Sequence, residues 1–132
     1  MYDEYKGKEG EIVNGTVQRI EMNKVYIDLD DALLIDNKIN ESLVPFLYKC
    51  INTNVSIVLI TKNMGDLQGY LSTFRIDKLF DKIIHLRQDQ EKSDFIDCDS
   101  SIFIDDSFAE RQEVADICKI PVFDLHMIDA LL

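Results

Sequence analysis

Acidic residues gather directly after an apolar stretch near the start of the chain. Residues 25–36, VYIDLDDALLID, run from mostly apolar side chains into Asp28, Asp30 and Asp31 and then become apolar again. Carboxylates this close raise one another's pKa and repel unless a cation or a proton lies between them. The stretch therefore predicts a site at which such a partner is bound.

Other polar side chains follow the later apolar stretches. A threonine ends the stretch after residues 55–60, two acids follow residues 101–104, and a lysine lies between the third and fourth stretches. Ligands of an open parallel sheet bind outside the carboxyl ends of its strands, so we expect these groups to meet at one edge. The full set is Asp28, Asp30, Thr61, Lys92, Asp105 and Asp106.

This set of side chains suggests a particular chemistry. Carboxylates alone are consistent with a hard divalent cation, which prefers oxygen ligands. Thr61 and Lys92 add two donors that suit the oxygens of a phosphoryl group. The set therefore predicts a phosphoryl group bound beside a divalent cation.

Short apolar stretches alternate with longer amphipathic ones along the chain. Most of the short stretches are continuously apolar, as is typical of strands buried on both faces of a parallel sheet. The alternation predicts an α/β fold, a three-layer Rossmann-like parallel sheet with helices on both faces. The expected strands are residues 24–29, 55–60, 82–86, 101–104 and 121–124, and the expected helices are residues 40–54, 65–74, 92–96, 107–119 and 125–132.

The polar residues at these strand ends match a known pattern. IDLDDAL resembles the first motif of the haloacid dehalogenase superfamily of phosphohydrolases, an apolar strand followed by Asp-x-Asp-x-Thr. IVLITKN resembles the second motif, Lys92 in EKSDFI the third, and IFIDDSF the fourth. All four occur in order, so residues 24–132 resemble a domain of this superfamily.

The resemblance implies a role for each residue of the set. Asp28 would attack phosphorus and form an aspartyl-phosphate, and Asp30 would act as general acid and base. Mg²⁺ would be held by Asp28, the main-chain carbonyl of Asp30, and Asp105 with or without Asp106. Thr61 and Lys92 would bind the transferring oxygens. The implied activity is a magnesium-dependent phosphatase acting on a phosphorylated substrate.

Two features of the sequence qualify this resemblance. The first motif has Ala32 where the superfamily has a threonine that braces the fourth-motif acids, so slowed turnover or an inactive enzyme remains open. The connections after Asp30 and between Thr61 and Lys92 are too short for a cap domain. A cap-less, open site predicts a macromolecular substrate or a partner subunit that covers it.

Residues 1–23 predict a short β-containing N-terminal extension. With the first strand, they resemble the opening of the RNA-binding OB module of a bacterial Nus-type transcription elongation factor, through GTVQRIE and VYIDL. An OB barrel needs five strands, so the module is incomplete and a chimera is one alternative. A rival function is a non-catalytic RNA-binding or interaction module on residues 1–29. An exposed strand edge here would favour a homodimer.

The two resemblances make incompatible demands on residues 25–29. The OB module pairs this strand antiparallel with the strand before it, whereas the phosphohydrolase sheet places it centrally between two parallel neighbours. The later segments supply more apolar area than residues 1–24, so we expect the parallel sheet.

Composition limits which binding partners and which cellular location are expected. Fourteen basic against twenty-five acidic residues give a net charge of -11, which disfavours nucleic acid and anionic lipid. No apolar run approaches the roughly 20 residues of a membrane helix. Three cysteines in no metal-binding spacing, together with an N-terminus that has no apolar leader, predict inert thiols and a cytoplasmic protein.

Simpler interpretations apply to each residue taken alone. Asp105 or Asp106 could cap the helix that follows. Lys92 alone would be a solvated charge, and Thr61 alone an ordinary strand end. His85 and His126 are isolated and favour structural or exposed positions. Only the joint pattern favours an active site.

Overall fold

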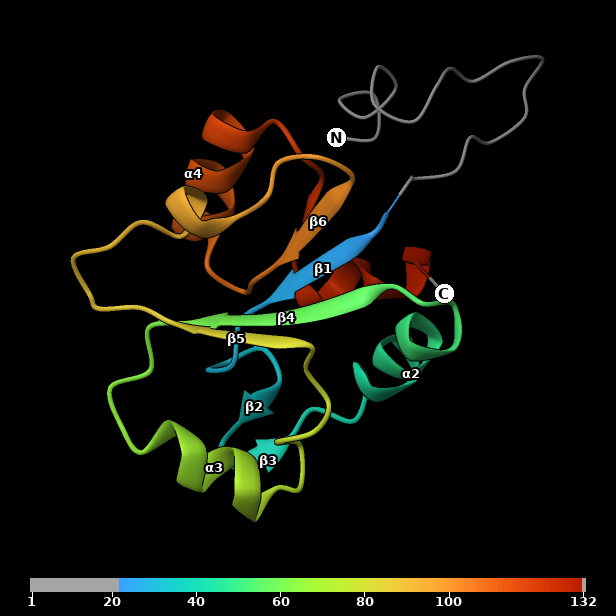
Figure 1. Ribbon diagram of the computed structural model, residues 1–132, viewed down its shortest axis with the longest axis vertical. Helices are drawn as coiled ribbons and strands as arrows, with labels where there is room; N and C mark the ends of the chain where they lie inside the picture. Colours follow the sequence, from blue (N-terminus) through green and yellow to red (C-terminus); the bar gives the residue numbers. More distant parts are fainter. Residues whose placement is uncertain (1–21, 132) are drawn as a thin grey trace.

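A five-stranded parallel sheet forms the centre of the molecule in the computed structural model, which describes residues 22–131 (Figure 1). Its strand order is β5-β4-β1-β6-β7, and every neighbouring pair is parallel. The predicted α/β class is confirmed. The strands are β1 (Lys24–Ile27), β4 (Ser56–Thr61), β5 (Lys82–His85), β6 (Ser101–Ile104) and β7 (Val122–Phe123).

Helices cover both faces of this sheet. Helix α4 and the short 3-10 helix η2 lie on one face, while α2 and the 3-10 helix η3 lie on the other (Figure 1). Pro45 lies in the first turn of α2, where its missing N–H costs little. The bounds are α2 (Val44–Asn52), α3 (Leu67–Thr73), η2 (Lys92–Phe95), α4 (Phe108–Cys118) and η3 (Leu125–Leu131).

Strand β1 lies in the middle of the sheet. Its residues pair in parallel register with β4 on one side and with β6 on the other, for example Val25 with Ile57 and with Ile102. Both rows of its backbone hydrogen bonds are therefore occupied, which confirms the parallel assignment of this strand over the antiparallel one. The predicted extension, its OB-like character and the homodimer through it fall largely on residues 1–21, which lie outside the described residues.

Alternation of side chains along the strands builds two cores. Val25 and Ile27 face α2 together with Ile57, Leu59, Ile102 and Ile104, while Tyr26, Val58, Ile60 and Phe103 face α4. Successive residues of a strand point to opposite faces, so continuously apolar strands are buried on both sides. The C-terminal 3-10 helix η3 adds to the α2-side core through Ile128, which is buried there.

A small antiparallel hairpin between β1 and α2 was not predicted. It consists of β2 (Leu34–Ile35) and β3 (Lys38–Ile39), joined through Asp36 and Asn37, both at positive φ. Strands of two residues are too short to produce a periodic pattern, which explains the omission. The hairpin is the only secondary structure between Asp30 and α2 in the described chain.

The cysteines differ from the sequence expectation. Cys98, after η2, and Cys118, the last residue of α4, form a disulfide with their Cα atoms 5.1 Å apart. The expectation of three inert thiols is therefore wrong for this pair, because the fold brings together residues separated by 20 positions. Cys50 is free and buried, and burial raises the pKa of its thiol to about 11.

None of the described helices combines the length and the apolar character that crossing a membrane requires.

Core packing predicts a contrast between two phenylalanines. Phe46 of α2 is 1% exposed, whereas Phe108 of α4 is 69% exposed. We expect Phe46→Ala to lower the free energy of unfolding by about 3–4 kcal/mol, because it leaves a cavity between α2 and the sheet. Phe108→Ala should cost less than about 1 kcal/mol. Urea unfolding followed by circular dichroism measures both, and equal losses would contradict this packing.

Candidate active site

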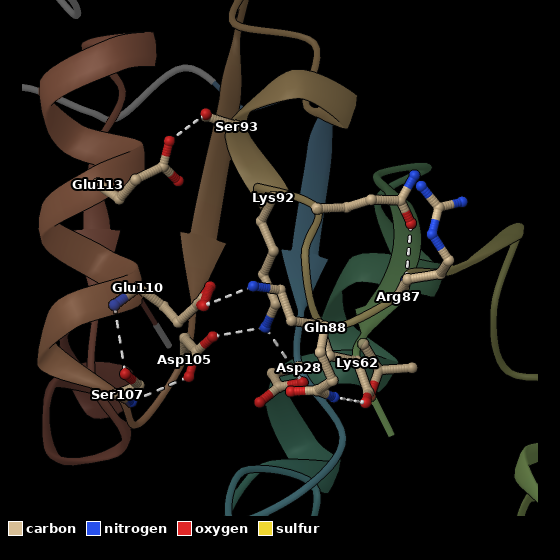
Figure 2. Close-up of polar contacts among 12 residues, drawn as sticks. Asp28, Lys62, Arg87, Gln88, Lys92, Ser93, Asp105, Ser107, Glu110 and Glu113 are labelled. Carbon is tan, nitrogen blue, oxygen red and sulfur yellow. Dashed lines mark hydrogen bonds and ion pairs between the residues drawn. The ribbon is translucent and has the colours of Figure 1, made fainter. Parts of the chain in front are cut away.

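One buried ammonium group joins two acids at the carboxyl edge of the sheet (Figure 2). Lys92 Nζ lies 2.8 Å from Asp105 Oδ2 and 3.3 Å from Asp28 Oδ1. The side chain of Lys92 is 2% exposed, that of Asp105 1% and that of Asp28 14%. These three predicted residues therefore meet, and the simpler interpretation of Lys92 as a solvated charge is wrong.

Local structure explains how Lys92 reaches this position. It begins η2, and Glu91 before it is extended, so the chain turns sharply into the site. Ser93 donates a hydrogen bond to Glu113 of α4, which holds η2 against that helix. The ammonium also lies 5.6 Å from the centre of the Phe103 ring, a distance suited to a cation–π contact.

Asp105 is fixed by the start of α4. Its Oδ1 accepts a hydrogen bond from the Ser107 main-chain N–H at 2.9 Å, and its carbonyl accepts one from Arg111 at 2.8 Å. Ser107 is the N-cap, because its hydroxyl accepts from the Glu110 N–H. The alternative that Asp105 or Asp106 caps this helix is therefore wrong.

Burial and charge shift the protonation of this cluster. The pKa of Asp28 is raised to about 7, mainly by burial; the charge of Lys92 lowers it and the nearby charge of Asp105 raises it. Burial would lower the pKa of Lys92, but the charges of Asp28 and Asp105 raise it above its ordinary value. Partial burial and the charges of Asp31 and Asp105 raise the pKa of Asp106. An additional cation at this edge would favour the ionised form of these acids.

The cluster opens into a cavity of about 260 Å³. Several of its lining residues were not predicted as part of the site, among them Lys62 and Gln88. Lys62 pairs with Glu110 of α4 at 3.3 Å, and Gln88 donates a hydrogen bond to the Lys62 carbonyl at 2.6 Å (Figure 2). The cavity is lined by Asp28, Asp30, Asp31, Lys62, Gln88, Lys92, Asp105, Asp106, Ser107 and Glu110.

Strand alternation explains why Lys62 rather than Thr61 lines this cavity. Asp28 and Asp105 follow Tyr26 and Phe103 by two positions, on the α4 side of the sheet. Lys62 follows Ile60 in the same way, whereas Thr61 follows Leu59 on the α2 side and is fully buried. Counting positions in each strand could have found Lys62.

Asp30 lies apart from the lysine cluster and is held by a different residue. The Asn63 side-chain amide lies 3.1 and 3.0 Å from the two Asp30 carboxylate oxygens. The Asn63 main-chain N–H donates to the Thr61 hydroxyl at 3.0 Å, and its carbonyl lies 2.7 Å from His85 Nε2. Asn63 thus connects both predicted residues, Asp30 and Thr61, with His85, an exposed side chain at the end of β5.

The donor set fits a hydrated magnesium ion better than a metal enclosed by protein. No three acidic, histidine or cysteine side chains between residues 22 and 131 converge closely enough to hold a metal by themselves. Mg²⁺ keeps several waters and binds through one or two carboxylates together with phosphate oxygens. Asp28 with Asp105 or Asp106, and the main-chain carbonyl of Asp30, could supply those ligands.

Comparison with known proteins supports the fold alone. No protein-family model matches the sequence, and no curated protein matches it. Among solved structures, the chain is similar to an uncharacterized protein from Corynebacterium glutamicum ATCC 13032 Kitasato, with 13% sequence identity and a TM-score of 0.63. The match covers 83% of this chain and 88% of the other, which supports the α/β sheet and assigns no activity.

The raised pKa of Asp28 predicts how stability depends on pH. Between its ordinary value of 3.8 and about 7, the folded state binds a proton that the unfolded chain has released. Wild-type stability therefore falls as pH rises through this window. Asp28→Asn should unfold like wild type near pH 4 and be more stable by roughly 2–4 kcal/mol at pH 8. Urea unfolding in a metal chelator at both pH values measures the difference.

A matched variant makes this test specific. Asp36→Asn removes an exposed carboxylate from the hairpin, so it should unfold like wild type at both pH values. A constant difference between Asp28→Asn and wild type across the pH range would contradict the proposed origin of the effect.

Proposed function

We propose that this protein is a magnesium-dependent phosphatase that acts through a phosphoryl-aspartate formed on Asp28. The observation that supports this best is the buried pairing of Lys92 with Asp28 and Asp105 at the carboxyl edge of the sheet. A nucleophilic carboxylate, a second acid and a fixed ammonium are the groups that such a reaction needs in one place.

The positions of the side chains support the following roles. An Asp28 oxygen attacks phosphorus, and the bond to the leaving oxygen breaks as the new one forms. Lys92 lies beside that oxygen and offsets the negative charge on the phosphoryl group. Lys62 lines the same cavity and supplies a second positive charge. Asp30 gives a proton to the leaving group and later takes one from the attacking water.

A bound magnesium ion would contribute charge neutralisation and alignment of the phosphoryl oxygens. Asp28, Asp105 or Asp106, and the Asp30 carbonyl would hold it. Between residues 30 and 92, the described secondary structure consists of the hairpin, α2, β4, α3 and β5, without a cap domain above the cavity. The open site suits a phosphate group on a large substrate or one covered by a partner.

Activity against an aryl phosphate tests this proposal. We expect purified protein to release phosphate from p-nitrophenyl phosphate with magnesium and to stop when a chelator is added. Asp28→Asn should lower kcat by at least about a thousandfold, because it removes the nucleophile. Asp36→Asn is the matched control and should retain wild-type activity, since its carboxylate does not line this cavity. Equal activity of the two variants would contradict the assigned nucleophile.

A phosphoryl mimic tests the geometry without turnover. We expect beryllium fluoride with magnesium to bind with its central atom next to an Asp28 oxygen and with its fluorides facing Lys92. A crystal structure of that complex shows the placement. Density for the mimic elsewhere, with Asp28 turned away, would overturn the mechanism.

A further inference from the structure

A second cavity of about 470 Å³ lies between the β2–β3 hairpin, α2 and residues 74–79. It shares no lining residue with the candidate active site. Its volume falls within the usual range for small-molecule sites. Its walls are mainly apolar, and they include Leu33 and Leu47, which are fully buried.

Helix α2 supplies one wall of this cavity from a single face. Val44, Leu47, Tyr48 and Ile51 recur at helical spacing, and all four line the cavity. Tyr48 is 54% exposed and Ile51 44% exposed, so this apolar face continues to the mouth. An occupant with an apolar body would remove both side chains from water.

Positive charge lines the opposite wall. Arg75 and Lys78 both line the cavity, and none of the described lining residues is acidic. Neither cation forms an ion pair with any residue of the described chain. In a protein of net charge -11, these two unpaired cations beside an apolar cavity favour a ligand with a negative charge.

Arg75 lies at the end of α3, where the backbone closes the helix. It has φ 59°, and the Arg75 and Ile76 N–H groups donate to Ser72 and Leu71 carbonyls in the pattern that closes a helix. Glycine is favoured at this position because a side chain is disfavoured at positive φ. Replacing Arg75 by glycine would therefore remove the cation without a cost to this helix end.

We infer that this cavity binds a small amphipathic anion, with an apolar acyl or aryl body against α2 and its anionic group at Arg75 and Lys78. The apolar walls suit the apolar body of the ligand. Arg75 and Lys78, which have no ion-pair partner in the described chain, suit its anionic group. Because Leu33 lies in the segment between Asp31 and the hairpin, the ligand would also contact the loop that follows the first-motif acids.

A pair of fluorescent probes tests this inference on the full chain. Anilinonaphthalene sulfonate is an apolar anion, and phenylnaphthylamine has the same rings without the sulfonate. We expect saturable binding of the sulfonate, displaced by decanoate. Arg75→Glu and Lys78→Glu should each weaken sulfonate binding about fivefold to tenfold and change phenylnaphthylamine binding less than twofold, because only the charged head contacts the cations.

Lys119→Glu is the matched control, since Lys119 is also a cation at positive φ after a helix but does not line the cavity. It should bind both probes like wild type.

Arg75→Gly separates binding from folding: the melting temperature should stay equal or rise while sulfonate binding weakens.

Three results would overturn the inference. They are no saturable sulfonate binding, equal effects of Arg75→Glu and Lys119→Glu, and a dimer in sedimentation that Tyr48→Glu abolishes. The last would show that a second copy of the chain covers this face.

Discussion

The buried ammonium of Lys92 is the constraint on which the arrangement of the site depends. A charge removed from water costs several kcal/mol unless it is paired at close range. Lys92 is compensated by Asp28 at the end of β1 and Asp105 at the end of β6. These two strands are neighbours in register, so their last side chains lie together only if the parallel sheet forms. The pairing thus links the sheet, η2 and α4 into one arrangement.

Sequence patterns were sufficient to predict those parts of the fold whose apolar patterns are long or recur along the chain. Continuously apolar strands and amphipathic helices predicted the parallel sheet. The acids after the first and fourth strands, with a lysine between the third and fourth, predicted that Asp28, Lys92 and Asp105 would meet. The two-residue strands of the hairpin and the Cys98–Cys118 pair lacked such a signal. They depend on tertiary packing, which local patterns do not contain.

Motif identity and strand register predict different contributions from residues 61 and 62. The motif resemblance gives the phosphate contact to Thr61, whereas the alternation along β4 places Thr61 on the α2 side and Lys62 on the α4 side with Asp28 and Asp105. The position of Lys62 also depends on Glu110, which is 48 residues away. Thr61 instead accepts from Asn63, the residue that holds Asp30, so its hydroxyl supports the loop that positions the acid.

Charge distribution separates the two cavities by the ligands they favour. The first is lined by six acids and two lysines, so a phosphate group would be repelled there unless a cation accompanied it. The second is lined by two cations and, within the described chain, by no acid, so an anion can bind there without a metal. Free phosphate would therefore compete with a phosphorylated ligand at the first cavity only when a metal cation is bound there. The lining charges therefore predict that ligand binding needs a cation at the first cavity and needs none at the second.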